Sequence, residues 1–159
     1  MNRPAKFALI LASLAIATPQ GAGAAVPNAK LWNGTWHLNP AASKFESSGK
    51  RESETRKYAI SGDKVLMKST SKTASGRTLT VSYSARTDGK YYPMTGNPNA
   101  DRIALSVVSE RELKWSSQLN GKTTIAGTAA VSTDGKHLTL KRTMLTVKGT
   151  PTDVLKFDR

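Results

Sequence analysis

Apolar and polar residues alternate with a period of two along most of the chain. In residues 77–86 the alternate apolar positions are Leu79, Val81, Tyr83 and Ala85, with threonine or serine between them. Because successive side chains of a β-strand point to opposite faces, this segment is predicted to be a half-buried strand. The same alternation recurs in runs that hold Ile103, Leu105 and Val107; Leu113, Trp115 and Leu119; Ile125, Gly127, Ala129 and Val131; Leu138, Leu140 and Met144; and Leu155 and Phe157.

Turn signals separate these runs: Gly62-Asp63, Ser75-Gly76, Asp88-Gly89, Asn120-Gly121, Asp134-Gly135 and Gly149. Asn-Gly and Asp-Gly accommodate positive φ and favour tight hairpins. Their spacing predicts a meander of roughly 8–10 consecutive strands. A sheet of that many strands has two exposed edges unless it closes on itself. We therefore predict an all-β fold, a single antiparallel up-and-down β-barrel, with a sandwich as the alternative.

Three segments depart from the alternation. Residues 39–44 begin Asn-Pro and are predicted to form a single helical turn, since proline suits a first helical position. Residues 46–56 are polar and charged, and are predicted to be a solvated loop that leads into a strand. Residues 91–101 are stiffened by Pro93 and Pro98, and are predicted either to rim the barrel mouth or to make a wide turn.

The first 25 residues have the pattern of a secretory signal peptide. Two basic residues precede the mostly apolar run 7–17, and Ala22-Gly23-Ala24 supplies the small residues of a cleavage site. The run is shorter than the roughly 20 residues that a membrane span needs. We therefore expect residues 1–25 to be removed, leaving one domain over residues 26–159 that is periplasmic or secreted and has no transmembrane segment.

The chain is strongly basic, with 24 Lys+Arg against 11 Asp+Glu and a net charge of +13. Loss of the signal peptide, which holds two cations and no acids, leaves +11. These cations are spread over turns and outward strand positions, without the basic run and stacking aromatics of a nucleic-acid site. The charge therefore predicts a solvated basic surface, or attraction to an anionic component of the cell envelope.

Candidate catalytic and metal-binding residues are few. The sequence contains no cysteine, and its two histidines, His37 and His137, form no metal-ligand motif. No Gly-x-Ser-x-Gly nucleophile elbow accompanies the serines. We accordingly expect a protein that is not an enzyme and that has no metal site and no cofactor.

Two motifs carry a family resemblance. Trp32-Asn33-Gly34-Thr35-Trp36-His37-Leu38-Asn39-Pro40 contains the Gly-x-Trp of a lipocalin opening strand, and residues 88–101 read DGKYYPMTGNPNAD. Together they resemble exported bacterial lipocalin-like domains, which are small barrels of the calycin type. The resemblance implies that Gly34 and Trp36 form a structural motif, with Trp36 packed across one end of the barrel and covered by an arginine from a late strand. Arg142 is the candidate for that arginine.

Inward-facing residues suggest a ligand site. The candidates are the large side chains Tyr83, Trp115, Met144 and Phe157. The small residues Gly127, Ala129 and Ala130 either leave a cavity for a small apolar ligand or accommodate Trp115 in a filled core. The favoured hypothesis is a non-catalytic binding protein for a small hydrophobic or amphipathic molecule. The alternative is a packed basic barrel that interacts with anionic envelope surfaces. The sequence does not determine the oligomeric state.

Overall fold

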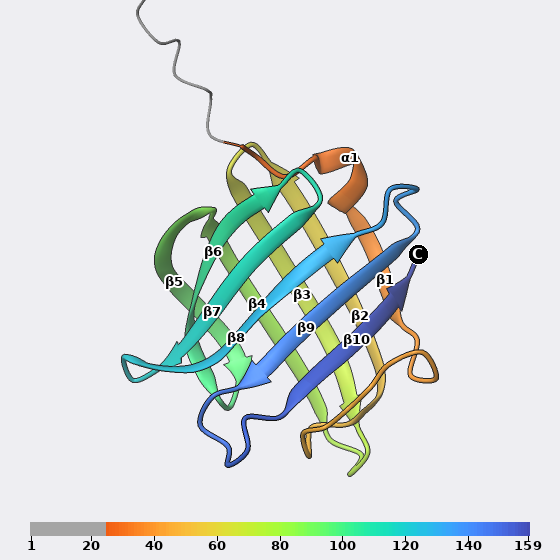
Figure 1. The fold of residues 1–159 in the computed structure, drawn as a ribbon, viewed down its shortest axis with the longest axis vertical. Helices are drawn as coiled ribbons and strands as arrows, with labels where there is room; N and C mark the ends of the chain where they lie inside the picture. The colour runs from red at the N-terminus through yellow and green to blue at the C-terminus, as the bar shows by residue number, and fades with distance from the viewer. Residues whose placement is uncertain (1–24) are drawn as a thin grey trace, which may run out of the picture.

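A computed structural model of the chain describes residues 25–159 (Figure 1). The predicted signal peptide lies outside these residues, apart from Ala25. The elements are α1 (Ala29–Trp32), β1 (Gly34–Leu38), β2 (Arg51–Ser61), β3 (Lys64–Thr73), β4 (Thr78–Arg86), β5 (Asp88–Asn97), β6 (Ala100–Ser109), β7 (Glu112–Leu119), β8 (Lys122–Val131), β9 (His137–Met144) and β10 (Thr152–Asp158).

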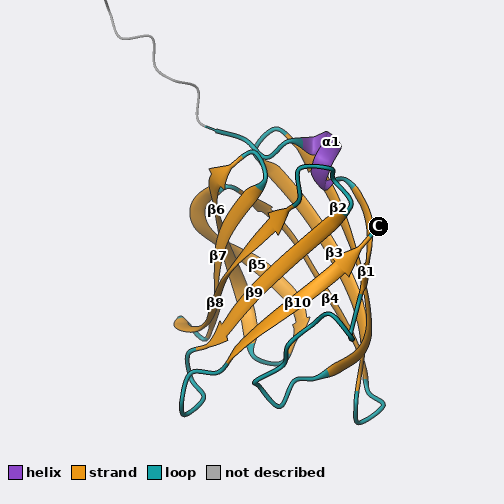
Figure 2. Cartoon of the chain, turned by 45° about the vertical axis from the view of Figure 1, so that its right-hand side comes forward, coloured by secondary structure: helices purple, strands orange, loops and turns teal. Residues whose placement is uncertain are grey.

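The ten strands form one closed antiparallel barrel. Each strand pairs with the next along the chain, and β1 closes the sheet by pairing with both β2 and β10. Closure removes the free edges that a flat meander would expose to water. The prediction of an up-and-down barrel is therefore confirmed. Figure 2 shows α1 at one end, here called the helix end, and the long β1–β2 connection at the opposite end, here called the loop end.

Two of the segments expected to be irregular belong instead to strands. Strand β2 starts at Arg51, so only the first part of residues 46–56 is a loop. Glu54 and Arg56 continue the alternation of the strand, but they point inward and are buried. Most of residues 91–101 lies in β5 and in its hairpin with β6. Residues 39–44 make a hydrogen-bonded turn, in which Ser43 N donates to Pro40 O at 3.3 Å, rather than a helix.

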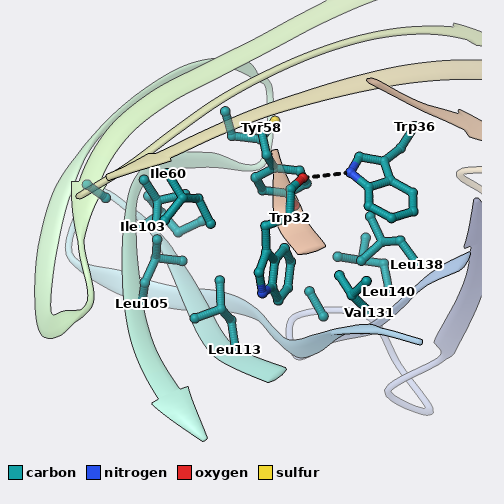
Figure 3. Packing of buried hydrophobic residues seen from close by; sticks show 14 of the residues in the cluster. Trp32, Trp36, Tyr58, Ile60, Ile103, Leu105, Leu113, Val131, Leu138 and Leu140 are labelled. Atoms are coloured by element: carbon teal, nitrogen blue, oxygen red, sulfur yellow. Dashed lines mark hydrogen bonds between the residues drawn. The ribbon is translucent and has the colours of Figure 1, made fainter. Parts of the chain in front are cut away.

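The helix end is closed by aromatic side chains. Trp32, on α1, and Trp36, on β1, are both 0% exposed. The Trp36 indole N–H donates to the Trp32 carbonyl at 3.0 Å (Figure 3), and the Trp32 indole N–H donates to the Glu110 carbonyl at 3.0 Å. Trp32 also meets Tyr58 edge to face, with ring centroids 5.6 Å apart. These contacts join α1 to both sides of the barrel, so the short helix is held by packing rather than by its own propensity.

Trp36 is covered by Arg159, not by Arg142. The guanidinium carbon of Arg159 lies 4.4 Å from the Trp36 ring centroid, and its Nη2 donates to the carbonyls of Leu31 and Asn33. Pairing of β1 with β10 explains this placement, because the register extended by one residue sets Arg159 opposite Trp36. Gly34 lies beside the same guanidinium and has φ +131°, a conformation that residues other than glycine rarely adopt. The expected cation–π cover is thus present, but the chain-terminal arginine supplies it.

Candidate ligand-binding cavity

The barrel encloses a cavity of about 70 Å³. Its apolar and aromatic lining consists of Tyr58, Met67, Val81, Tyr83, Met94, Ile103, Leu105, Leu113, Trp115, Ile125, Ala129 and Leu140. Its polar lining consists of Arg51, Arg56, Ser69, Asn97, Ser117 and Arg142. The apolar set extends towards the helix end, whereas Arg51 stands where β2 begins, at the loop end. The cavity is therefore amphipathic along the barrel axis.

The four predicted ligand-binding residues separate into two groups. Tyr83 and Trp115 line the cavity. Met144 ends β9 and Phe157 is fully buried in the core, and neither is among the lining residues. The Phe157 ring instead lies beneath Arg56, whose guanidinium carbon is 5.5 Å from the ring centroid. All four belong to strands, but a period of two reports the face of a residue and not its depth along the barrel.

The small residues of β8 make room for Trp115. A Cβ added at Gly127 would lie 2.8 Å from Cζ2 of Trp115 and 2.0 Å from the carbonyl oxygen of Lys141. Glycine at this position therefore allows the indole to lie directly against β8. Ala129, two residues further on, lines the cavity. The structure thus combines the two alternatives, since the wall accommodates Trp115 and a small cavity remains.

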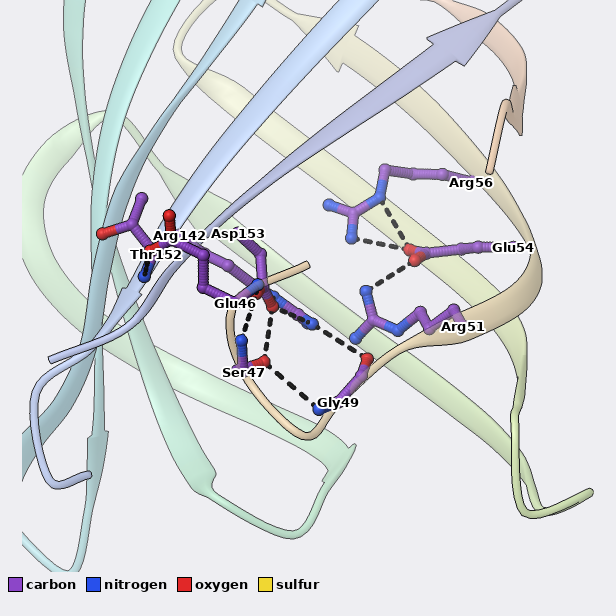
Figure 4. A network of polar contacts seen from close by, with 9 residues as sticks. All are labelled: Glu46, Ser47, Gly49, Arg51, Glu54, Arg56, Arg142, Thr152 and Asp153. Carbon is purple, nitrogen blue, oxygen red and sulfur yellow. Dashed lines mark hydrogen bonds and ion pairs between the residues drawn. The ribbon is translucent and has the colours of Figure 1, made fainter. Parts of the chain in front are cut away.

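Glu54 anchors one buried ion-pair cluster, on β2 (Figure 4). Its Oε2 accepts from Arg51 Nη1 at 2.7 Å, and its Oε1 accepts from Arg56 Nη2 at 2.7 Å and Nε at 3.1 Å. Arg56 Nη1 also donates to the Tyr58 hydroxyl at 3.2 Å. Burial would raise the pKa of Glu54, but the two guanidinium groups outweigh burial and hold this pKa below its ordinary value of 4.5.

Asp153 anchors a second cluster, between β9 and β10. Its Oδ2 accepts from Arg142 Nη2 at 2.7 Å and from the Ser47 hydroxyl at 2.6 Å, while Oδ1 accepts two backbone N–H groups at 2.8 Å. Arg142 Nη2 also donates to the Gly49 carbonyl at 3.2 Å. Burial opposes ionisation of Asp153, but the Ser47 and Arg142 contacts outweigh it and lower its pKa. The β1–β2 connection is thereby tied to the barrel wall.

The two clusters together hold more positive than negative charge. Three guanidinium groups, from Arg51, Arg56 and Arg142, meet the two carboxylates of Glu54 and Asp153. Burial lowers the pKa of Arg51 to about 10, Glu54 opposes that shift, and the neighbouring Arg142 and Arg56 add to it. Arg51 therefore remains charged at neutral pH, with less compensation than either of the other two arginines receives.

An apolar groove of about 490 Å³ lies outside the same wall, over β2 to β5. Met67 and Tyr83 line both the groove and the cavity, so these side chains separate the two. The wall is weakly connected here, because β4 and β5 are paired only at Ser82–Thr95 and Tyr83–Met94. Gly96 permits the close approach, since a Cβ at this residue would lie 1.7 Å from the Thr80 carbonyl oxygen.

Glu54 and Asp153 are expected to make the fold sensitive to acid. Their folded-state pKa values lie below the ordinary values of 4.5 and 3.8, so the unfolded chain takes up protons at a higher pH than the folded chain. The stabilisation is complete above pH 4.5 and is lost as the pH falls through the lowered values. Urea unfolding at pH values between about 7 and about 3 measures this loss of stability, because the range includes the ordinary pKa values of both carboxyl groups. An unchanged free energy of unfolding at the acid end would contradict the ion-pair assignment.

Residues 25–159 contain no cluster of three or more histidine or acidic side chains arranged to hold a metal ion. Within the same residues, no helix has the length and apolar character of a membrane span.

Comparisons with known proteins identify a fold but no sequence family. Neither a family model nor a curated protein matches the chain. Among solved structures, the crystal structure of zebrafish ileal bile acid-binding protein complexed with cholic acid is similar, with a TM-score of 0.54 and 16% identity over 81% of this chain and 98% of that chain. The likeness is one of fold. This chain is a closed antiparallel barrel of ten strands, and its fold is similar to that of the zebrafish protein.

Proposed function

We propose that this protein is an exported, non-catalytic binding protein that takes a small amphipathic molecule into its barrel. The observation that carries the proposal is the cavity itself, which joins an apolar wall to a set of buried arginines. Ligand sites in proteins combine a mostly apolar lining with a few placed polar groups in this way. The fold shared with a bile acid-binding protein supports the same function.

The size of the cavity restricts the ligand. An engineered cavity of about 150 Å³ binds benzene, whereas this one measures about 70 Å³. A four-ring steroid such as cholic acid therefore does not fit without large rearrangement. A slender aliphatic chain needs a smaller rearrangement than a steroid, because Met67 and Met94, which line the cavity, are unbranched and adapt their shape readily. Displacement of Met67 and Tyr83 would also join the cavity to the outer groove.

Two adjacent alanines of β8 provide a matched test of this site. Ala129 points into the cavity, whereas Ala130 is its neighbour on the outward face. Ala129→Leu is expected to fill the cavity and to weaken binding of octanoate and 1-octanol by at least about tenfold. Ala130→Leu is expected to leave both affinities unchanged. Isothermal titration calorimetry measures the affinities, and thermal unfolding verifies that both variants fold.

Binding of neither probe by the wild-type protein would overturn the proposal. Equal affinity in the wild type and Ala129→Leu would show that the probes bind outside the barrel. The export component rests on the pattern of residues 1–25. The mass of the protein recovered from its own cells tests that component, because cleavage removes these residues and a full-length mass would contradict it.

A further inference from the structure

The loop end of the cavity offers hydrogen-bond donors that have no acceptor. Arg51 uses only Nη1, and Arg142 uses only Nε and Nη2, for bonds within residues 25–159. The indole N–H of Trp115 and the hydroxyl of Ser117 are buried and have no hydrogen-bond partner in the same part of the chain. All four residues line the cavity. Buried polar groups in native proteins are nearly always paired, so these two buried groups without a partner, beside two guanidinium groups with N–H donors to spare, indicate an acceptor that binds there.

The carboxylates of the buried clusters do not supply that acceptor, and Asp101 Oδ1, a buried oxygen without a partner in residues 25–159, belongs to a residue outside the cavity lining. Glu54 and Asp153 are the two carboxylates of the buried clusters, and neither lines the cavity. Both are already engaged, Glu54 by two arginines and Asp153 by Arg142 and the β1–β2 connection. The third guanidinium leaves one positive charge in excess. A buried cation is costly unless it is paired, so the excess favours a negatively charged partner.

The donors converge from two walls of the barrel. Trp115, Gly127, Arg142 and Asp153 occupy one continuous cross-strand row from β7 to β10. The indole lies against Gly127, whose cross-strand partner on β9 is Arg142. Arg51 comes from β2, and Figure 4 shows its guanidinium group directed towards that of Arg142. An acceptor placed between the two arginines is therefore reached from both sides.

We infer that Arg51 and Arg142, together with the Trp115 indole N–H, bind the carboxylate of an amphipathic ligand whose aliphatic part lies against the apolar wall. This inference rests on the proposed function and specifies the ligand class. A carboxylate offers only acceptors, and it matches the planar fork of a guanidinium group. It also neutralises the excess charge. Hydrogen bonds that involve charged groups are the strong ones, so the carboxylate supplies much of the affinity.

Octanoate and 1-octanol test the inference, because they share a chain and differ in the head group. The wild-type protein is expected to bind octanoate at least about tenfold more tightly than 1-octanol. Arg51→Gln is expected to abolish this preference and to leave the 1-octanol affinity unchanged. Its fold is expected to persist, because two arginines and two carboxylates remain in the clusters. Arg77→Gln, on the exposed β3–β4 hairpin, removes the same charge and serves as the control.

Each outcome bears on a different statement. Equal affinity of the wild type for the two probes would overturn the carboxylate inference and leave the proposed function standing. Binding of neither probe would overturn both. A preference for octanoate that persists in Arg51→Gln would show that Arg51 is not part of the site. If both Arg51→Gln and Arg77→Gln lose the preference, the preference depends on overall charge and not on Arg51. If Arg51→Gln does not fold, Arg51→Lys retains the charge without the guanidinium fork and is expected to show a reduced preference.

Discussion

Replacing Glu54 with glutamine is expected to lower the free energy of unfolding by about 3–5 kcal/mol. The carboxylate of Glu54 is the shared partner of Arg51 and Arg56, and all three side chains are largely buried. Glutamine keeps the shape of the side chain but leaves both guanidinium groups without a counter-charge. The cost is therefore that of an unpaired buried charge. Urea or thermal unfolding of the variant measures it.

Glu52 provides the control on the same strand. It points outward, and its contact with Lys72 at 3.4 Å joins two half-exposed side chains. Exposed pairs contribute about 0–1 kcal/mol, so Glu52→Gln is expected to change stability very little. An equal loss in the two variants would show that net charge matters and that the buried cluster does not. The Glu54 variant is also expected to lose less stability at acid pH than the wild type, because one of the two responsible carboxyl groups is absent.

Replacing Trp36 with alanine is expected to destabilise the protein by about 3–5 kcal/mol. Trp36 is 0% exposed, donates to the Trp32 carbonyl and lies beneath Arg159. Its removal leaves a cavity at the helix end and detaches α1 and the end of the chain from a common partner. Chemical denaturation measures the loss.

His37→Ala is the matched control for Trp36, because His37 is the next residue of β1 and is exposed. Its expected effect is within about 0.5 kcal/mol. A loss below about 1 kcal/mol in Trp36→Ala would exclude a core role for this tryptophan. Arg159→Ala is expected to lower the free energy of unfolding by a smaller amount, about 0.5–2 kcal/mol, which is the contribution of a cation–π contact.

Alternation and turn chemistry were sufficient to predict the barrel from the sequence. A period of two assigns each residue to a face, and glycine-containing turns every dozen or so residues allow only hairpin connections. Helix α1 was harder to predict, because it has four residues and no helical period of its own. Contacts of Trp32 with the barrel stabilise it, and such long-range contacts leave no local pattern.

The polar end of the cavity was not predicted, although a signal was present. Counting back by twos from Ile60 and Tyr58 places Arg56 and Glu54 on the inward face. Interpretation by hydrophobicity assigned this segment to a loop, because charged residues are usually exposed. Burying these charges costs free energy, and the contacts of Glu54 with Arg51 and Arg56 compensate for it. Mutual pairing of this kind depends on three-dimensional geometry, which a hydropathy pattern does not contain.

The candidate site residues show what strand periodicity leaves undetermined. Tyr83 and Trp115 lie at the cavity, whereas Phe157 packs in the core. The difference is one of level along the barrel, which depends on the stagger between strands. Strand register likewise decides that Arg159 covers Trp36, while Arg142 bonds to Asp153. Register results from pairing across the whole sheet, so no single segment of the sequence reveals it.

Nuclear magnetic resonance of the three indole N–H groups tests most directly whether the barrel interior binds a ligand. Trp32 and Trp36 donate to backbone carbonyls at the helix end, whereas Trp115 lines the cavity and its buried indole N–H has no partner within residues 25–159. On titration with 1-octanol, the Trp115 signal is expected to shift and saturate, and the other two are expected to stay nearly unchanged. A Trp115 signal that does not move at saturating 1-octanol would contradict binding inside the barrel.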